Sequence, residues 1–315
     1  MNPTRRCAPE LLKQDLSGKI YIITGANSGV GLGTARQLVE QGAHVVLACR
    51  RVSAGEEAAQ TLATLSGTTE VIALDLGSLS SVRAFAEAFL ERHSRLDALV
   101  NNAGLMNTPQ GKTQDGFETQ FGVNHLGHFL LTELLLEVLK SSAPSRVICV
   151  ASAYHVEAQG KPGRIVLDDL NFERRPYDGW EAYAQAKLAN VLHAQELARR
   201  LEGSGVSAFS VHPGWVRTNL ISSTMPSWLQ NVVMRPIGAL IDLISVEDGA
   251  QTTLHCLLDP QVPETSGAFY AQTGSFPDKQ DRKGGWPMTS PNPQVRDLAL
   301  AEALYVRSRD LVGLT

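Results

Sequence analysis

The chain has 315 residues, of which 43% are apolar and 19% are charged, and its 28 basic and 32 acidic residues give a formal net charge of −4. This apolar content supplies a large core and excludes a disordered chain, and the residue usage excludes collagen, coiled-coil and small disulfide-rich proteins. Because there is no basic excess, we also exclude a general nucleic-acid-binding protein.

The cysteines and the amino-terminal segment bear on the compartment. Cys7, Cys49, Cys149 and Cys256 lie far apart with no paired spacing, which predicts neither a zinc site nor a disulfide framework and favours a reducing, cytoplasmic location. The amino-terminal residues contain no apolar stretch of the length that a signal peptide needs, so we expect none. No apolar run approaches the roughly 18 residues that a bilayer requires, so we expect no transmembrane segment.

From Lys19 onward, short β-branched runs alternate with longer helical stretches. Strands are predicted at 20–24, 44–50, 71–76, 98–104, 146–152, 206–214 and 267–271. These runs are nearly continuous in apolar character, as in a parallel sheet covered on both faces. We therefore predict an α/β fold with one Rossmann-type, doubly wound sheet of about seven strands in the order 3-2-1-4-5-6-7. The domain should span residues 17–315 after an extension of residues 1–16, with irregular segments at 155–181, 215–250 and 272–295.

The first predicted strand leads into a glycine-rich turn, TGANSGVGLG (24–33), and then into a helix that continues to about Gln41. Gly25, Gly29 and Gly31 lack a Cβ, which lets the loop take unusual backbone angles and lets a pyrophosphate approach the backbone. The helix offers free N–H groups to that anion. Glycines alone are weak support, but a strand before them and a helix after them predict a nucleotide site.

The end of the second predicted strand indicates which nucleotide binds. A site for NAD usually places an acid there to hold the ribose 2′-hydroxyl, whereas here Cys49 is followed by Arg50 and Arg51. A guanidinium suits a 2′-phosphate, so we predict NADP(H) as the cofactor with Arg50 as the contact. The alternative is that both arginines simply begin a surface helix. Asp75 and Leu76, which end the third predicted strand, are expected to border the adenine, unless Asp75 is only a helix cap.

Three further features follow in chain order. Asn101-Asn102-Ala103-Gly104 comes after the fourth predicted strand, Ser152 after the fifth, and Tyr183 and Lys187 in a helical stretch. Tyr183 and Lys187 are four residues apart and share one helix face. An ammonium beside a phenol lowers the phenol pKa, so Tyr183 is predicted to exchange a proton near neutral pH. A tyrosine and a lysine with this spacing usually form only a surface pair. After the NNAG segment and Ser152, however, they predict an active site.

Together these motifs resemble the short-chain dehydrogenase/reductase family, because TGANSGVG, NNAG, Ser152, YAQAK and HPG occur in sequence. Within that family, the segments DGFETQFGVNHLGHFLLTELLLEVLKSSAPSRVICVAS and KLANVLHAQELARRL are most similar to the retinol-dehydrogenase-like branch. The similarity extends from about Leu16 to Tyr270.

The resemblance implies a role for each matching residue. Tyr183 is the general acid/base, and Lys187 lowers its pKa and binds the nicotinamide ribose. Ser152 orients the substrate oxygen, and Asn124 holds a water in a proton relay unless it only bonds backbone. The full set of expected cofactor-binding residues is Gly25, Asn27, Ser28, Gly29, Val30, Gly31, Arg50, Asp75, Leu76, Asn102, Ala103, Gly104, Tyr183, Lys187, Pro213, Gly214, Val216 and Thr218.

We expect no metal ligands. His125, His128 and His155 cluster in the sequence around the predicted site, but no second group of ligand-type residues matches them. Packing of these histidines within helices and loops is the alternative that we favour.

Residues 215–246 are predicted to form a lid over the substrate, since they carry apolar side chains such as Trp215, Met225 and Trp228. Such a lid suits a bulky hydrophobic carbonyl compound. The alternatives are an amphipathic helix packed on the core, or a peripheral contact with a membrane that only Arg217 and Arg235 would assist. The Gly- and Pro-rich stretch 273–294 is either an ordered loop near the lid or an exposed connector.

The predicted function is NADP(H)-dependent interconversion of a hydrophobic aldehyde or ketone and its alcohol, with retinal/retinol suggested by the branch. The alternatives are a reductase of a steroid or specialised-metabolite carbonyl, a reductase of a tetrapyrrole double bond, and a catalytically silent nucleotide-binding regulator. The presence of Ser152, Tyr183 and Lys187 disfavours the regulator. Most soluble family members pair through helices that match 122–140 and 183–202, so we expect a homodimer unless that apolar face is buried against the sheet.

Overall fold

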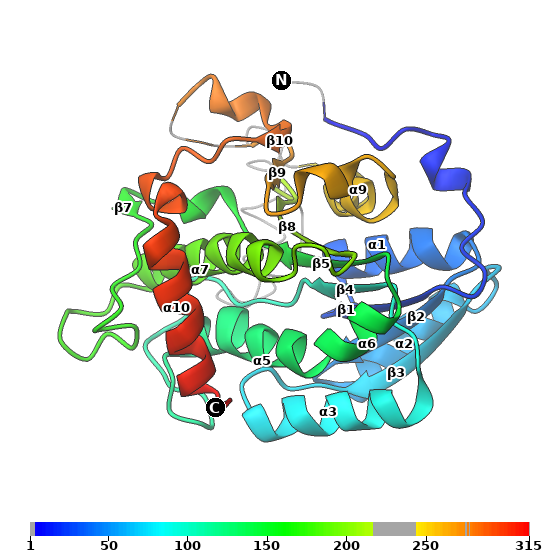
Figure 1. Ribbon diagram of the computed structural model, residues 1–315, viewed down its shortest axis with the longest axis horizontal. Coiled ribbons are helices and arrows are strands. Elements are labelled where there is room, and N and C mark those ends of the chain that lie inside the picture. The colour runs from blue at the N-terminus through cyan, green and yellow to red at the C-terminus, as the bar shows by residue number, and fades with distance from the viewer. Residues whose placement is uncertain (1–3, 217–243, 275, 277, 315) are drawn as a thin grey trace, which may run out of the picture.

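The computed structural model describes residues 4–216, 244–274, 276 and 278–314, and within them a central sheet runs in the order β10-β9-β8-β5-β4-β1-β2-β3 (Figure 1). Neighbouring strands pair in parallel except β10, which pairs antiparallel with β9. The predicted doubly wound sheet is confirmed, with one additional edge strand. The strands are β1 (Ile20–Thr24), β2 (His44–Cys49), β3 (Thr68–Ala73), β4 (Ala98–Asn101), β5 (Ser145–Val150), β8 (Val206–His212), β9 (Phe269–Ala271) and β10 (Gly285–Met288).

Helices cover both faces of this sheet and enclose two cores (Figure 1). One face carries α1 (Gly29–Glu40), α2 (Val52–Leu62) and α9 (Val246–Leu258). The other carries α3 (Leu79–Arg92), α5 (Gly127–Leu134), α6 (Leu136–Ser141) and α7 (Gly179–Arg200). Successive strand residues serve opposite cores: Ile22 belongs to one, and Tyr21 and Ile23 belong to the other. This two-sided burial explains why the strands read as continuous apolar runs.

The predicted bounds of the third strand are wrong at both ends. β3 covers Thr68–Ala73 rather than 71–76. Its end is set by a turn in which the Asp75 carboxylate accepts the N–H of Gly77 at 2.9 Å. Leu74 and Leu76 are buried core residues beyond the strand, so their apolar character reflects burial in a turn and not strand pairing.

The predicted helix at 122–140 is divided in the structure. It begins with α4 (Thr119–Phe121), passes through a π-helical turn at Gly122–Leu126, and continues as α5 and α6, which meet at Leu135. Single π-helical turns are rare and occur frequently at functional sites.

Two segments that were expected to be irregular contain short strands. Residues 155–181 include the hairpin of β6 (Glu157–Ala158) and β7 (Lys161–Pro162), and residues 272–295 include β10. The stretch 273–294 is an ordered part of the domain where it is described, because Ser290 and Asn292 bond His155. The Ser290 hydroxyl lies 2.6 Å from Nε2 of His155, and the Asn292 amide donates to the His155 carbonyl at 2.7 Å.

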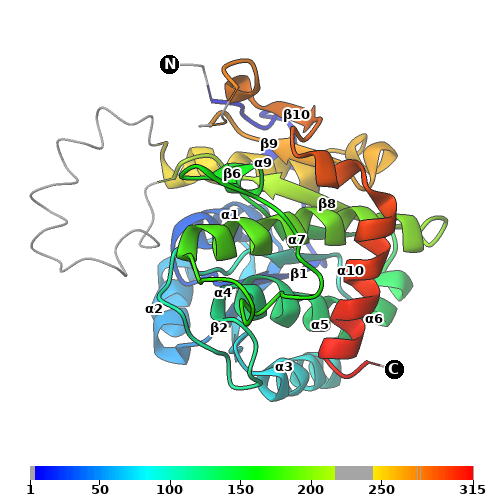
Figure 2. The ribbon, with the colours of Figure 1, turned by 90° about the vertical axis from the view of Figure 1, so that its left-hand side faces the viewer.

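The amino-terminal extension packs against the domain near β10 (Figure 2). The N–H of Arg5 donates to the side chain of Gln272 at 2.6 Å, and its guanidinium donates to the carbonyl of Gly284 at 3.1 Å. Arg6 forms an ion pair with Asp248 on α9 at 2.8 Å. The described part of residues 1–16 is therefore integrated into the fold.

The carboxyl-terminal helix α10 (Leu298–Leu311) lies across α5 and α7 (Figures 1 and 2). The Tyr305 hydroxyl donates to one oxygen of Glu133 at 2.7 Å, and Arg309 donates to the other at 2.9 Å. The ring of Phe129 meets the Tyr305 ring edge to face at 5.1 Å between centroids. α10 thus contacts part of the two helices that we expected to pair two chains. Among the described residues, no helix is both long and apolar enough to span a bilayer.

Candidate active site

The glycine-rich loop between β1 and α1 has the shape that a phosphate site needs. Gly25 and Gly29 have φ angles of 65° and 55°, which residues with a Cβ rarely adopt. A Cβ on Gly31 would lie 2.6 Å from the amide nitrogen of Asn102, so only glycine fits there. Ser28 precedes α1 without capping it through its side chain. The first N–H groups of this helix are therefore available to an anion.

Thr24, the last residue of β1, joins this loop to the NNAG segment. Its hydroxyl accepts the N–H of Asn102 at 2.8 Å and the N–H of Ala103 at 2.9 Å. The Asn102 amide in turn donates to the Thr24 carbonyl at 2.8 Å. The predicted cofactor residues Asn102 and Ala103 are thus fixed beside the glycine loop by a residue that sequence reasoning did not select.

A buried histidine extends this network to Asn124. Nε2 of His128 lies 2.8 Å from the Thr24 hydroxyl, and its Nδ1 lies 3.0 Å from the carbonyl oxygen of Asn124. Because a carbonyl only accepts, Nδ1 carries the hydrogen and Nε2 accepts from Thr24. Burial lowers the pKa of His128 to about 3, so the ring stays neutral at physiological pH.

Ser152, Tyr183 and Lys187 converge where β5 ends. Nζ of Lys187 donates to the Val150 carbonyl at 2.8 Å and lies 5.7 Å from the centroid of the Tyr183 ring. Ser152 lies close enough to the Tyr183 phenol to lower its pKa, although burial has the larger and opposite effect. The Ser152 hydroxyl also accepts the N–H of Tyr154 at 3.2 Å. The structure therefore brings together the serine, tyrosine and lysine that the sequence pattern selected.

Asn124 is fully buried in the π-helical turn and borders the same space. Its carboxamide bonds the backbone of Leu105, accepting the N–H at 2.7 Å and donating to the carbonyl at 2.9 Å. A Cβ on Gly104 would lie 3.1 Å from the Asn124 oxygen and 3.5 Å from Nζ of Lys187. Gly104 thus lies directly beside both side chains, and Asn124 fixes the backbone that follows it.

Burial has the largest effect on the pKa values of Tyr183 and Lys187. It raises the pKa of Tyr183 to about 12, with Ser152 acting in the opposite direction. It also lowers the pKa of Lys187 to about 8. We had expected the ammonium to lower the tyrosine pKa. In this structure the desolvation of both groups is the larger effect, since Nζ is directed to a carbonyl and not to the phenol.

Aromatic side chains border Tyr183 on its outer side. The Tyr154 ring lies 6.0 Å from the Tyr183 ring, 5.4 Å from the Trp180 ring and 5.5 Å from the Trp215 ring, each in an edge-to-face arrangement. Met106 packs against the same cluster. Sequence reasoning missed Tyr154 and Trp180, although the former is two residues after Ser152 and the latter is three residues before Tyr183 on α7.

This geometry agrees with comparisons to known proteins. A model of the short chain dehydrogenase family matches residues 19–162. Retinol dehydrogenase 12 of Homo sapiens is 44% identical over 302 residues, which cover 95% of this chain and 88% of the relative. The chain belongs to the short-chain dehydrogenase/reductase family. It is an oxidoreductase of alcohol and carbonyl groups, and this family uses nicotinamide cofactors.

Two solved structures show the same fold. An uncharacterized protein from Mycobacterium paratuberculosis is 38% identical, with a TM-score of 0.74 and coverage of 95% of each chain. RhlG of Pseudomonas aeruginosa, in an active-site complex with NADP, is 25% identical, with a TM-score of 0.65, and the match covers 84% of this chain and 97% of RhlG.

No acid stands at the end of β2, where we expected the ribose of the cofactor to bind. The strand ends at Cys49, which is buried, and this burial raises the pKa of its thiol. Arg50 follows it, is exposed, and bonds no residue that the structure describes. Arg51 is the N-cap of α2. Arg50 is therefore free to contact a ligand, whereas Arg51 does begin a surface helix.

The remaining predicted cofactor residues fall into two groups. Pro213 and Gly214 follow β8, and Val216 forms an isolated parallel bridge with Ile244. Val216 also reaches the glycine loop, because Gly249 lies close to the side chains of both Val216 and Val30. Thr218 and residues 217–243 of the expected lid lie outside the described residues.

The three histidines near this site of the short-chain dehydrogenase/reductase bond hydroxyl groups. His125 lies 2.9 Å from Ser308, His128 lies 2.8 Å from Thr24, and His155 lies 2.6 Å from Ser290. These contacts agree with a packing role for the three rings.

The residues present fit a dinucleotide. Gly31 lies where any Cβ would collide with Asn102. Within the described parts of the chain, the first turn of α1 has free N–H groups and the guanidinium that follows β2 is unpaired. When bound, the nicotinamide ring supplies or accepts the hydride. The protein contributes the groups that place the substrate oxygen and exchange its proton.

Proposed function

We propose that this short-chain dehydrogenase/reductase uses NADP(H) to interconvert a hydrophobic aldehyde or ketone and its alcohol, with Tyr183 as the general acid/base. The observation that carries the proposal is the convergence of Ser152, Tyr183 and Lys187 where β5 ends. They lie beside an aromatic wall that consists of Tyr154, Trp180 and Trp215. Met106 and Ala184 pack in the same cluster, so the surroundings of Tyr183 suit an apolar substrate.

The proposed chemistry follows from the protonation of the site. Burial keeps Tyr183 protonated at neutral pH, so it can donate a proton to the substrate oxygen during reduction. In the reverse direction its oxygen takes that proton back. Ser152 holds the substrate oxygen beside the phenol, and Lys187 is held by Val150 at a distance from which its charge can stabilise a phenolate. Asn124 acts by fixing the Leu105 backbone and, as the resemblance implies, by holding a relay water.

The choice of NADP(H) is supported by Arg50. It is exposed and unpaired among the described residues, and no carboxylate stands at the end of β2 to hold a ribose 2′-hydroxyl. A guanidinium binds a 2′-phosphate through charge-assisted hydrogen bonds. The NADP complex of RhlG adds support from a related fold.

Retinal and retinol are the substrates that we propose to test first. This proposal is supported by the printed name of the human relative at 44% identity and by the aromatic wall, which suits a long conjugated chain. The alternative substrate is a steroid or specialised-metabolite carbonyl, which the same wall could contact. We also propose a cytoplasmic location, since all four cysteines are buried and unpaired.

The experiment is NADPH consumption against a panel of hydrophobic aldehydes and ketones that includes all-trans-retinal, with NADH in parallel. Turnover of retinal with preference for NADPH is the expected result. Turnover of other carbonyls alone would keep the mechanism and replace the substrate. Tight NADPH binding without turnover on any substrate would overturn the retinal proposal and leave an untested substrate or the silent regulator.

A further inference from the structure

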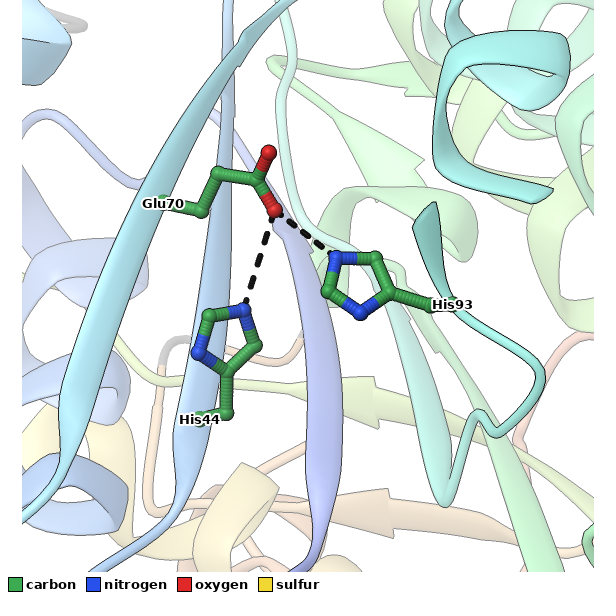
Figure 3. A group of neighbouring side chains, drawn as sticks. All are labelled: His44, Glu70 and His93. Atoms are coloured by element: carbon green, nitrogen blue, oxygen red, sulfur yellow. Dashed lines mark hydrogen bonds and ion pairs between the residues drawn. The ribbon is translucent and has the colours of Figure 1, made fainter. Parts of the chain in front are cut away.

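Two histidines and a glutamate meet on the side of the sheet where β2 begins, away from the carboxyl ends of the strands that carry the active site. His44 is the first residue of β2, Glu70 lies within β3, and His93 is the C-cap of α3. Figure 3 shows both imidazole rings directed at the same carboxylate oxygen of Glu70. Ser152 and Tyr183, in contrast, lie beyond the carboxyl ends of the strands. No step of the proposed reaction uses this group.

The three potential ligand atoms are spaced as a metal site requires. Nε2 of His93 lies 2.8 Å from Oε2 of Glu70, Nε2 of His44 lies 3.8 Å from the same oxygen, and all three atoms lie within 4.8 Å of one another. Ligands of a tetrahedral zinc ion stand about 3.3 Å apart, as its bond lengths of roughly 2.0–2.2 Å imply. The two distances to Glu70 fall on either side of that value, so small side-chain movements complete the geometry.

One ligand atom of this group has no hydrogen-bond partner. Nε2 of His44 is buried and makes no hydrogen bond with any residue that the structure describes. The other ring nitrogen of His44, Nδ1, lies 2.7 Å from the hydroxyl of Thr68. Metal-binding histidines commonly use their second nitrogen in this way, because it fixes the ring and its tautomer. The 3.8 Å between Nε2 of His44 and Oε2 of Glu70 is too long for a direct hydrogen bond, and an ion between the two atoms would connect them.

Glu70 also has the outer hydrogen bond that is typical of a metal-binding carboxylate. Its other oxygen, Oε1, bonds Arg92, which leaves Oε2 for the two histidines. Carboxylates that bind metals are commonly hydrogen-bonded by such outer groups. The positive charge of Arg92 opposes a bound cation. Its side chain is 53% exposed, however, so solvent screens much of that charge.

We propose that His44, Glu70 and His93 form a zinc site, with water as the fourth ligand. A Zn²⁺ ion there takes the place of the hydrogen that His93 shares with Glu70, and His93 binds it as a neutral ring protonated on Nδ1. The ion connects β2, β3 and the end of α3. It therefore acts on the stability of this edge of the fold and not on hydride transfer.

The test uses tag-free protein that has been stripped with a chelator. Zn²⁺ is titrated calorimetrically, Co²⁺ is followed by its visible absorption, and thermal unfolding is recorded with Zn²⁺ and with Mg²⁺. We expect one Zn²⁺ per chain, a tetrahedral Co²⁺ spectrum with nitrogen and oxygen ligands, and a higher Tm with Zn²⁺ only. A chain that binds no Zn²⁺ in the titration would show that the group is an ion-pair cluster only.

Substitutions locate the ion. His44→Gln and His93→Gln should each weaken Zn²⁺ binding by more than about tenfold, and Thr68→Val by about tenfold through loss of the ring-orienting contact. Arg92→Met should strengthen binding, because it removes an opposing charge, whereas a purely structural ion pair predicts no gain. His255→Gln is the matched control, since His255 is a half-buried histidine beside a single carboxylate, Asp259, at 3.5 Å. Equal zinc affinity in His44→Gln, His93→Gln and the control would overturn the proposal, even with Zn²⁺ bound elsewhere.

Discussion

The hydroxyl of Thr24 lies 2.8 Å from Nε2 of His128, and this contact joins the end of β1 to the helical segment that carries Asn124. Thr24 also accepts two backbone N–H groups of the NNAG segment. One hydroxyl thus fixes the proposed cofactor side of the site, and the neutral imidazole links it to the backbone of Asn124. Thr24 and His128 can therefore hold the residues of the site in place without contacting the substrate.

Thr24→Val should weaken both the fold and cofactor binding. Valine keeps the volume but leaves the N–H groups of Asn102 and Ala103 without their acceptor, which should lower the free energy of unfolding by about 2 kcal/mol. NADPH affinity should fall by about tenfold, because these backbone groups border the cofactor site. Urea unfolding and NADPH fluorescence titration measure the two effects.

The matched control for this substitution is Thr34→Val. Thr34 is equally buried, but its hydroxyl only donates to the carbonyl of Val30 within α1 at 2.9 Å. We expect little change in NADPH affinity for this variant. Equal losses in both variants would show that the Thr24 effect is a general cost of changing a buried threonine.

Tyr183→Phe should lower turnover by a factor of about 10² to 10⁴, because it removes the proton that the substrate oxygen receives. NADPH binding should persist, since the ring remains packed beside Tyr154. The control is Tyr154→Phe, whose lost hydroxyl is bonded by Gln159 at 3.2 Å and lies outside the proposed proton path. Steady-state kinetics with the best substrate of the panel decide the result. Unchanged turnover in Tyr183→Phe would exclude this residue as the acid.

The parallel core of the fold could be predicted from the sequence because buried parallel strands carry their signal locally. β1 matches its predicted range at both ends, and β2 differs by one residue. β10 was missed because Gly285–Met288 contains proline and glycine and pairs only at the edge of the sheet. Its place there depends on β9, which no local pattern reveals.

The candidate site likewise contains residues that the sequence reveals and residues that it does not. Ser152, Tyr183 and Lys187 could be selected because their order and spacing follow from the elements that carry them. Thr24 and His128 could not, because their contact spans 104 residues and consists of one hydroxyl and one ring nitrogen. The tyrosine pKa was expected to shift in the wrong direction, since spacing places Lys187 nearby but does not reveal that burial outweighs its charge.

Arg50→Ala should raise the KM for NADPH by about 10- to 100-fold and leave the KM for NADH nearly unchanged. The expected loss is that of one or two charge-assisted hydrogen bonds to a 2′-phosphate. Arg51→Ala is the control, because Arg51 is the neighbouring arginine and occupies the N-cap position of α2 without a capping hydrogen bond. An equal rise in the KM for NADPH and for NADH would mean that Arg50 supports the loop and does not bind the 2′-phosphate. An effect of Arg51→Ala alone would transfer the role to the neighbouring arginine.

His193→Leu should reduce the loss of stability in acid. Burial lowers the pKa of His193 to about 4, and Nε2 has no hydrogen-bond partner among the described residues. An unfolded chain binds a proton there at about pH 6.5, whereas the folded chain binds it only near pH 4. Protonation therefore favours the unfolded state as the pH falls between these values, and this contribution to stability is lost completely below about pH 4.

Leucine abolishes that titration at a position that already packs against Phe129. Relative to its own value at pH 7.5, the variant should retain up to about 3 kcal/mol more stability at pH 4 than the unsubstituted chain. Urea unfolding across this pH range measures the difference. His212→Leu should change the curve in the same direction, since burial lowers the pKa of His212 to about 3. If the free energy of unfolding falls equally with pH in the unsubstituted chain and in both variants, these histidines become protonated without unfolding.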